Sequence, residues 1–269
     1  MEAYGNFAAV YDEFMDETPY EEWGEFLTGL IEKYGISKPV FGQSTEDKLR
    51  SERDLVVDLG CGTGTFTEYM AARGYDMIGV DNAQEMLSLA MEKRDAAGSS
   101  TLYLLQDMRE LELYSTVGTV LSVCDCVNYL LEEEELLQTF RLVNNYLYPG
   151  GIFLFDFNTV YKYEQIIGDT TIAENREDCS FIWENYYDPD SQINEYDLTI
   201  FVQEGKEDCF RRFQENHYQR GYTPERMKQL VELAGLRVEL MIDADSHGEV
   251  APESQRVYIL AREVKKNGM

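Results

Sequence analysis

The chain has 269 residues, of which 51 are acidic and 23 basic, so its formal charge is -28. This length accommodates one large α/β domain, or one domain with an insertion, together with an ample core. Such an acidic field repels the phosphates of nucleic acids and anionic membrane surfaces, which excludes both as expected partners.

The cysteine pattern and the first residues indicate the compartment. Five cysteines occur without zinc-finger spacing, and the chain has only two histidines. An odd number of cysteines in a long chain indicates free thiols in a reducing setting, and the shortage of ligand clusters predicts no bound metal. The N-terminus does not resemble a signal peptide, and no stretch approaches the length of a membrane span. We therefore expect a soluble, cytoplasmic protein.

Residues 1–41 are expected to form helices before the sheet begins. Apolar and tyrosine side chains recur at three- and four-residue steps between residues 4 and 15. Thr18-Pro19 then opens a second helical segment. Two interpretations stay open: the helices only pack on the domain, or Tyr11 and its neighbours cover a bound cofactor. The polar, aperiodic residues 42–53 are expected to form a surface loop.

A strand, a glycine turn and a helix are predicted between Asp54 and residue 73. An apolar run, interrupted only by Asp58, precedes glycines at three alternate positions. These are Gly60, Gly62 and Gly64. Glycine lets the backbone approach a ligand closely, and a helix N-terminus offers free N–H groups and a partial positive charge. The acid before the turn repels a pyrophosphate but suits a cationic amino group.

The glycine spacing distinguishes between two possible ligands. The dinucleotide fingerprint is G-x-G-x-x-G, and its third glycine position is occupied here by Thr65, which disfavours NAD. The string Val57-Asp58-Leu59-Gly60-Cys61-Gly62-Thr63-Gly64 resembles the first motif of class I S-adenosylmethionine-dependent methyltransferases. The resemblance implies S-adenosyl-L-methionine as cofactor, with Asp58, Cys61 and the three glycines beside it.

The second strand, over 75–80, ends in a second candidate cofactor ligand. Asp81 lies about 20 residues beyond the glycine turn, where an acid accepts hydrogen bonds from ribose hydroxyls. Alternatively, Asp81 caps the following helix, although Asn82 is available for that role. Met86, in the first turn of the helix, is placed either to cover an adenine or to pack in the core.

The next two strands, over 102–105 and 119–123, also end in polar groups. Asp107 and Met108 match the adenine-binding pair of the methyltransferase family, unless Asp107 is simply a turn residue. After the fourth strand, small Cys124 allows the backbone close to the cofactor. Asn128 and Tyr129 follow as candidates to face the methyl acceptor, with helix capping and core packing as the alternative.

Residues 158–219 have a different character from the segments around them. Alternating strands are expected over 182–187, 193–203 and 209–218, as an antiparallel sheet placed to form a lid over the site. His217 on the last of them is a candidate catalytic base, or else a structural histidine. A buried fifth strand over 152–157 precedes this segment.

The rest of the chain returns to the α/β pattern. Thr223-Pro224 begins a helix, and two closing strands follow over 236–242 and 255–263. The sequence therefore predicts a Rossmann-like, doubly wound, seven-stranded sheet. Its core is expected over 54–157 and 220–264, with the inserted sheet between these segments and the N-terminal helices over the cofactor.

The resemblance is to the small-molecule branch, similar to sugar N,N-dimethyltransferases and glycine N-methyltransferase-like enzymes, and to uncharacterised bacterial relatives. It implies methyl transfer to an amine, hydroxyl or carboxylate, mainly through alignment of acceptor and methyl group. His217, Tyr129 and Tyr11 are the candidates to accept a proton. The alternatives are a methyltransferase acting on a protein and a cofactor-binding protein without catalysis. A homodimer is possible.

Overall fold

The computed structural model describes residues 8–15, 19–40, 52–205, 209–264 and 266. These residues form a seven-stranded sheet in the order β10-β11-β5-β4-β1-β2-β3 and a four-stranded sheet in the order β6-β7-β8-β9. The strands of the larger sheet are β1 (Leu55–Leu59), β2 (Asp76–Asp81), β3 (Leu102–Leu105), β4 (Val117–Ser122), β5 (Leu147–Asn158), β10 (Leu236–Asp243) and β11 (Arg256–Glu263). Strands β1 to β5 pair in parallel, whereas β11 is antiparallel to both β5 and β10. The predicted fold class is confirmed.

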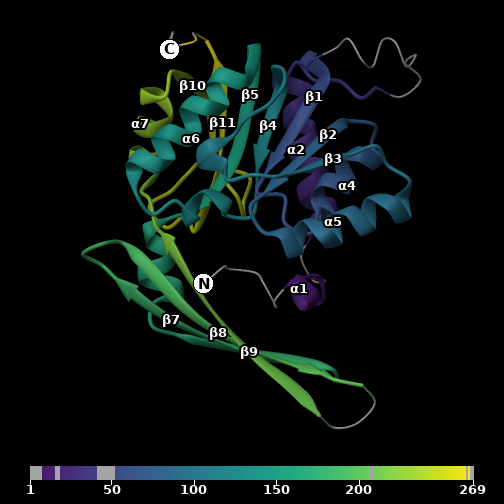
Figure 1. Cartoon of the computed structure of the whole chain (residues 1–269). Coiled ribbons are helices and arrows are strands. Elements are labelled where there is room, and N and C mark those ends of the chain that lie inside the picture. The colour runs from purple at the N-terminus through teal and green to yellow at the C-terminus, as the bar shows by residue number, and fades with distance from the viewer. Residues whose placement is uncertain (1–7, 16–18, 41–51, 206–208, 265, 267–269) are drawn as a thin grey trace.

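Helices cover both faces of the larger sheet (Figure 1). They are α2 (Tyr20–Tyr34), α4 (Thr65–Ala72), α5 (Gln84–Ala97), α6 (Glu133–Tyr146) and α7 (Pro224–Leu233). Side chains alternate along β5, so Phe153 and Phe155 pack with α6 and α7, whereas Ile152 and Leu154 pack with α2 and α4. Burial on both faces explains why this strand is almost continuously apolar.

The four-stranded antiparallel sheet comprises β6 (Thr171–Asn175), β7 (Cys179–Asp188), β8 (Ile193–Gln203) and β9 (Phe210–Arg220). It lies beyond the carboxyl ends of the core strands, and α1 (Ala8–Phe14) lies between the two parts (Figure 1). The sequence predicted three of its strands but not β6, because this edge strand is short and largely exposed and lacks an apolar alternation. A π-helical turn at Lys162–Ile167 leads into the sheet and was also not predicted.

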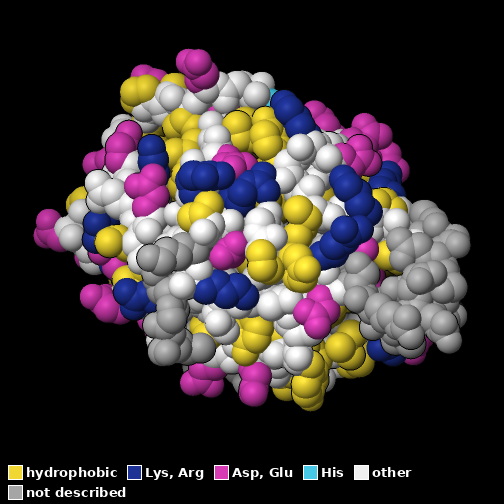
Figure 2. All heavy atoms as spheres, turned by 90° about the horizontal axis from the view of Figure 1, so that it is seen from above, with side chains coloured by type: hydrophobic (Ala, Val, Ile, Leu, Met, Phe, Trp, Pro, Cys, Tyr) yellow, Lys and Arg dark blue, Asp and Glu magenta, His cyan; other side chains and the backbone are white. Residues whose placement is uncertain are grey.

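Two sequence predictions fall mainly outside the described residues: the beginning of the first helix and most of the 42–53 loop. No helix among the described residues combines the length and apolar character needed to cross a membrane. Figure 2 shows the end of the core opposite the four-stranded sheet. Lys and Arg side chains lie there among acidic and apolar ones, so the acidic surplus does not produce a uniformly acidic surface on this face.

Candidate functional site

A cavity opens where β1, β2 and β4 end, at the glycine turn before α4. Its lining residues come from the predicted strand ends and from α1 and α2. They are Tyr11, Tyr20, Asp58, Leu59, Gly60, Cys61, Gly62, Thr63, Thr65, Phe66, Val80, Asp81, Asn82, Met86, Gln106, Met108, Val123, Cys124, Cys126 and Tyr129. The carboxyl ends of parallel strands form the ligand crevice in open α/β sheets, and this cavity has that position.

The three glycines of the turn serve different purposes. Gly62 has φ +54°, and a Cβ built on it meets no atom within 4 Å, so this position faces open space in the cavity. A Cβ on Gly60 would lie 2.6 Å from the Cys126 sulfur, and one on Gly64 would lie 2.5 Å from the Tyr103 hydroxyl. Gly64 does not line the cavity, so packing rather than a ligand requires glycine there.

Asp58 is a buried carboxylate beside the turn. Its Oδ2 accepts a hydrogen bond from the Thr67 hydroxyl at 2.6 Å, whereas Oδ1 has no hydrogen-bond partner among the described residues. Burial raises the pKa of Asp58 from 3.8 to about 6. A buried carboxylate oxygen without a partner is costly unless a ligand donates to it. Its position in the cavity wall therefore fits a bound cationic amino group.

Asp81 connects the end of β2 to the glycine turn. Its Oδ2 accepts from the backbone N–H of Gly62, and its Oδ1 accepts from that of Ala83, both at 2.8 Å. Burial raises the pKa of Asp81. Asp81 lines the cavity, and each of its carboxylate oxygens retains capacity for a further bond, because an ionised carboxylate accepts about four hydrogen bonds. Asp81 thus performs the capping role and keeps capacity for ribose hydroxyls.

The other predicted cofactor residues divide into two groups. Asn82, Met86, Met108 and Cys124 line the cavity, but Asp107 does not. The Asp107 carboxylate instead caps a short helical turn and pairs with the guanidinium of Arg109, which lowers the pKa of Asp107. The structure therefore favours the turn interpretation for the Asp107 side chain.

The two residues predicted to face the acceptor, Asn128 and Tyr129, lie in different environments. Tyr129 lines the cavity, and its hydroxyl lies 3.3 Å from His217 Nδ1. His217 is 3% exposed, and its Nε2 lies 3.3 Å from a carboxylate oxygen of Glu215. The three side chains thus form a row that leads from the cavity into the four-stranded sheet.

Asn128, in contrast, is fully buried and does not line the cavity. Its amide donates to the backbone carbonyls of Asn158 and Arg220 at 2.9 and 2.7 Å and accepts from the Asn158 backbone N–H at 2.9 Å. These bonds connect the ends of β5 and β9, so the packing alternative describes the position of Asn128.

Helix α1 is attached to the glycine turn by a polar cluster. Asp12 accepts from the Thr63 hydroxyl at 2.6 Å and pairs with Lys93 at 2.6 Å. Lys93 also donates to the hydroxyls of Thr63 and Thr65. This attachment holds Tyr11 in the cavity wall, where burial raises the pKa of its phenol well above the ordinary value.

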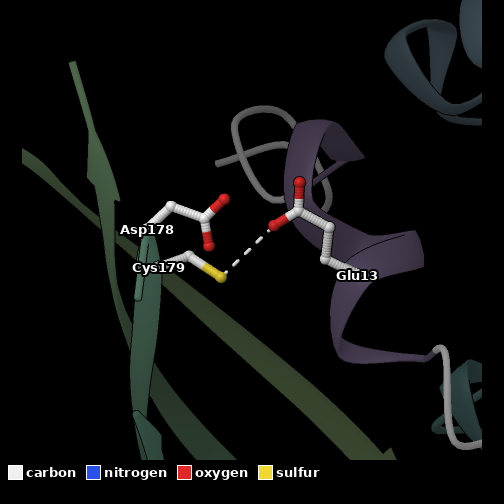
Figure 3. A group of neighbouring side chains, drawn as sticks. All are labelled: Glu13, Asp178 and Cys179. Atoms are coloured by element: carbon white, nitrogen blue, oxygen red, sulfur yellow. Dashed lines mark hydrogen bonds between the residues drawn. The ribbon is translucent and has the colours of Figure 1, made fainter. Parts of the chain in front are cut away.

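A second group of side chains attaches α1 to the four-stranded sheet. Glu13 from α1 lies beside Asp178 and Cys179, as Figure 3 shows, and the Cys179 thiol donates to its carboxylate at 3.3 Å. Burial and this contact raise the pKa of Cys179 to about 12. The hydrogen bond joins α1 to the start of β7, so we interpret the group as a contact between these elements.

Several lining residues were not predicted as site residues. They include Tyr20, Phe66, Gln106 and Cys126. Three of them directly follow or lie within motifs that the sequence identified, so proximity to a strand end was an available signal. Tyr20 is different: it begins α2, and no pattern in its own segment separates a cavity wall from a packing face.

Residues 56–151 match the family model described as a methyltransferase domain. A Geobacillus sp. (strain WCH70) protein named as a methyltransferase is 35% identical over 260 residues, covering 96% of this chain and 99% of that one. The crystal structure of an S-adenosylmethionine-dependent methyltransferase from Clostridium acetobutylicum superposes with a TM-score of 0.81 at 25% identity, covering 97% of this chain and 99% of that chain. A Streptomyces venezuelae dTDP-3-amino-3,4,6-trideoxy-alpha-D-glucopyranose N,N-dimethyltransferase is 32% identical over 101 residues, or 38% of this chain and 41% of that protein.

The sheet order, the glycine turn and the acid at the end of β2 define a nucleoside-binding α/β enzyme. With these relatives, the chain belongs to the class I S-adenosylmethionine-dependent methyltransferases, and S-adenosyl-L-methionine is its cofactor.

Proposed function

We propose that this methyltransferase acts on a small-molecule acceptor and not on a protein. The observation that carries the proposal is the covering of the cavity: Tyr11 and Tyr20 close it from the N-terminal helices, and the four-stranded sheet lies beyond Tyr129. A site enclosed from two sides leaves room for a compact acceptor rather than a folded protein surface. The similarity to an amino-sugar N,N-dimethyltransferase supports the same class.

The proposed cofactor contacts follow from the cavity wall. The Asp58 oxygen without a partner accepts a hydrogen bond from the amino group of the cofactor, and Asp81 accepts from its ribose hydroxyls. Because Gly62 has no side chain, its backbone can lie close to the cofactor. Met86 and Met108 cover the adenine, and the Met108 backbone N–H is the proposed donor to a ring nitrogen. The cofactor supplies an activated methyl group on a sulfonium centre. The protein then contributes mainly alignment, worth roughly 7–11 kcal/mol when the geometry is good.

Proton removal is the chemical task left for side chains when the acceptor is an amine or hydroxyl. Tyr129 is placed to contact the acceptor, and His217 lies behind it to take the proton through the Tyr129 hydroxyl. Glu215 stabilises the protonated imidazole that results. Burial raises the pKa of Tyr11, so its phenol stays neutral and serves as a hydrogen-bond donor.

An acceptor screen tests the proposed function. Purified protein is incubated with S-adenosylmethionine and panels of small amines, alcohols, carboxylic acids and basic proteins, and S-adenosylhomocysteine is measured by mass spectrometry. Turnover confined to small molecules is the expected result. Turnover on proteins alone would assign the enzyme to the protein-modifying class. Cofactor binding without turnover on any panel would favour a non-catalytic binding protein.

The raised pKa of Asp58 predicts pH-dependent cofactor binding. The cationic amino group pairs with the ionised carboxylate, so binding below about pH 6 must first release a proton. Affinity for S-adenosylhomocysteine should therefore fall as pH is lowered from 7 to 5, approaching tenfold per unit. Calorimetry in buffers of different ionisation enthalpy should detect the released proton. Asp58→Asn is the control: its affinity should be lower and should lose this dependence, and an unchanged pH profile would contradict the assignment.

His217→Ala is expected to lower turnover at least about tenfold on the acceptor that the screen identifies. The reason is loss of the proton acceptor behind Tyr129. Tyr129→Phe keeps the ring and removes only the hydroxyl, so it separates the two roles. Cofactor affinity of the His217 variant should be unchanged, since His217 does not line the cavity. Intact turnover in the His217 variant, with an unaltered pH–rate profile, would refute its catalytic role.

A further inference from the structure

The buried face of β9 is polar where a packed strand is expected to be apolar. Glu215, His217 and Gln219 alternate along it and are 6%, 3% and 2% exposed. Buried polar side chains are costly unless they have hydrogen-bond partners. Glu215 lies beside His217, whereas the other two have partners in the turn that follows β4: His217 contacts Tyr129, and Gln219 contacts Asp125.

Asp125 is held by a chain of hydrogen bonds from the four-stranded sheet. The Gln219 amide donates to Asp125 Oδ2 at 2.6 Å, and its oxygen accepts from the Tyr163 hydroxyl at 2.6 Å. Asn158 in turn donates to the Tyr163 oxygen at 3.2 Å. One carboxylate oxygen is thereby fixed in direction. No ion pair to Asp125 occurs within the described part of the chain, and the residue keeps partial exposure.

The backbone at this point is also unusual. Cys124 and Asp125 are consecutive non-glycine residues with φ of +64° and +52°. This left-handed region is unfavourable for most residues and persists only where surrounding structure imposes it. Here it carries the chain from Cys124, which lines the cavity, to Asp125, which contacts β9.

The nearby cations are already engaged. Arg256 pairs with the buried Asp156, and Lys162 donates to the Asn158 side chain at 2.9 Å. Among the residues found to line the cavity, the charged ones are both acids, Asp58 and Asp81. The site therefore offers carboxylates and no cation of its own, which is unsuited to an anionic acceptor.

Asp125 does not line the cavity itself, but its neighbours Cys124 and Cys126 both do, and Gln219 connects it to Tyr163. Burial is the main reason that the pKa values of Tyr11, Tyr163 and Tyr196 are raised, and the charge of Asp125 acts in the same direction on all three. A partly exposed carboxylate between two cavity-lining residues is a suitable partner for an ammonium group, through a charge-assisted hydrogen bond.

We propose that Asp125, oriented by Gln219, is the acceptor-recognition residue and that the acceptor is an amine bound as its ammonium. This inference rests on the proposed function and narrows its acceptor class. The ammonium transfers one proton to His217 through Tyr129, and the freed nitrogen lone pair attacks the methyl carbon. A new C–N bond forms as the C–S bond breaks, with the C–S electron pair returning to sulfur.

Binding of sinefungin tests the proposal before any acceptor is known. This cofactor analogue carries a protonated amine where the transferable methyl group would be, whereas S-adenosylhomocysteine carries nothing there. The wild-type protein should bind sinefungin about tenfold more tightly than S-adenosylhomocysteine. Asp125→Asn should lose at least tenfold in sinefungin affinity while keeping its affinity for S-adenosylhomocysteine within twofold. Asparagine tolerates a left-handed φ and still accepts from Gln219, so the variant is expected to fold.

Glu184→Gln is the matched control, because it removes one negative charge from an exposed position of the four-stranded sheet and should change neither affinity. Equal sinefungin affinities in the wild type and Asp125→Asn would overturn the proposal, as would wild-type protein that binds the two ligands equally. An equal loss of S-adenosylmethionine affinity would assign Asp125 to the sulfonium instead and would also overturn it. Failure of every protein to bind S-adenosylhomocysteine would mark failure of the proposed function.

Discussion

Gly62→Val should abolish detectable binding of S-adenosylmethionine. A Cβ at Gly62 meets no protein atom within 4 Å, so the added side chain occupies the space proposed for the cofactor and not the core. The left-handed φ of +54° adds backbone strain of roughly 1–2 kcal/mol. We therefore expect a modestly lowered melting temperature together with loss of the calorimetric binding signal.

Gly98→Val provides a matched control for that strain. Gly98 ends α5 with φ +64°, and a Cβ there also meets nothing within 4 Å, but this residue is exposed and does not line the cavity. Its melting temperature should fall by a similar amount while cofactor affinity stays at the wild-type value. Retained affinity in Gly62→Val would show that the cofactor does not approach this part of the turn.

Asp81→Ala should weaken cofactor affinity by more than tenfold, or over ~1.4 kcal/mol. The substitution removes the proposed ribose contact and also releases the backbone N–H groups of Gly62 and Ala83. Asp81→Asn separates these effects, because an amide oxygen still accepts from one N–H while the negative charge is lost. Calorimetric titration with S-adenosylhomocysteine measures both variants.

Asp95→Ala serves as the control for that series. Its carboxylate pairs with Arg94 on the surface of α5 and is 71% exposed, so its removal should leave affinity unchanged. If Asp81→Ala binds like Asp95→Ala, Asp81 acts only as a cap and the ribose assignment is wrong.

Local sequence signals account for most of the core of this protein. The strand, glycine turn and helix around Gly62 follow from backbone chemistry within about a dozen residues, and Thr223 caps α7 as predicted, accepting from the Arg226 N–H at 3.2 Å. The apolar run of β5 is likewise determined by burial on both faces. Such patterns can be predicted because each depends on neighbours close in the chain.

Of the site residues predicted from motifs, some line the cavity and others do not. Asp58, Asp81 and Met86 line the cavity as expected, because strand ends in a parallel sheet share one edge. Asp107 and Asn128 bind other groups instead: Asp107 pairs with Arg109, and Asn128 bonds to the backbone of Asn158. Sequence position indicates the edge of the sheet at which a side chain lies, but not the direction in which that side chain points.

The groups proposed to bind the acceptor are brought together by tertiary structure alone. Gln219 reaches Asp125 across 94 residues of chain, and His217 reaches Tyr129 across 88. In sequence, Gln219 is one polar residue on an alternating strand, and Asp125 lies between two cysteines. Only the docking of the four-stranded sheet on the turn after β4 brings these groups together, because long-range packing, and no local pattern, determines which buried polar atoms meet.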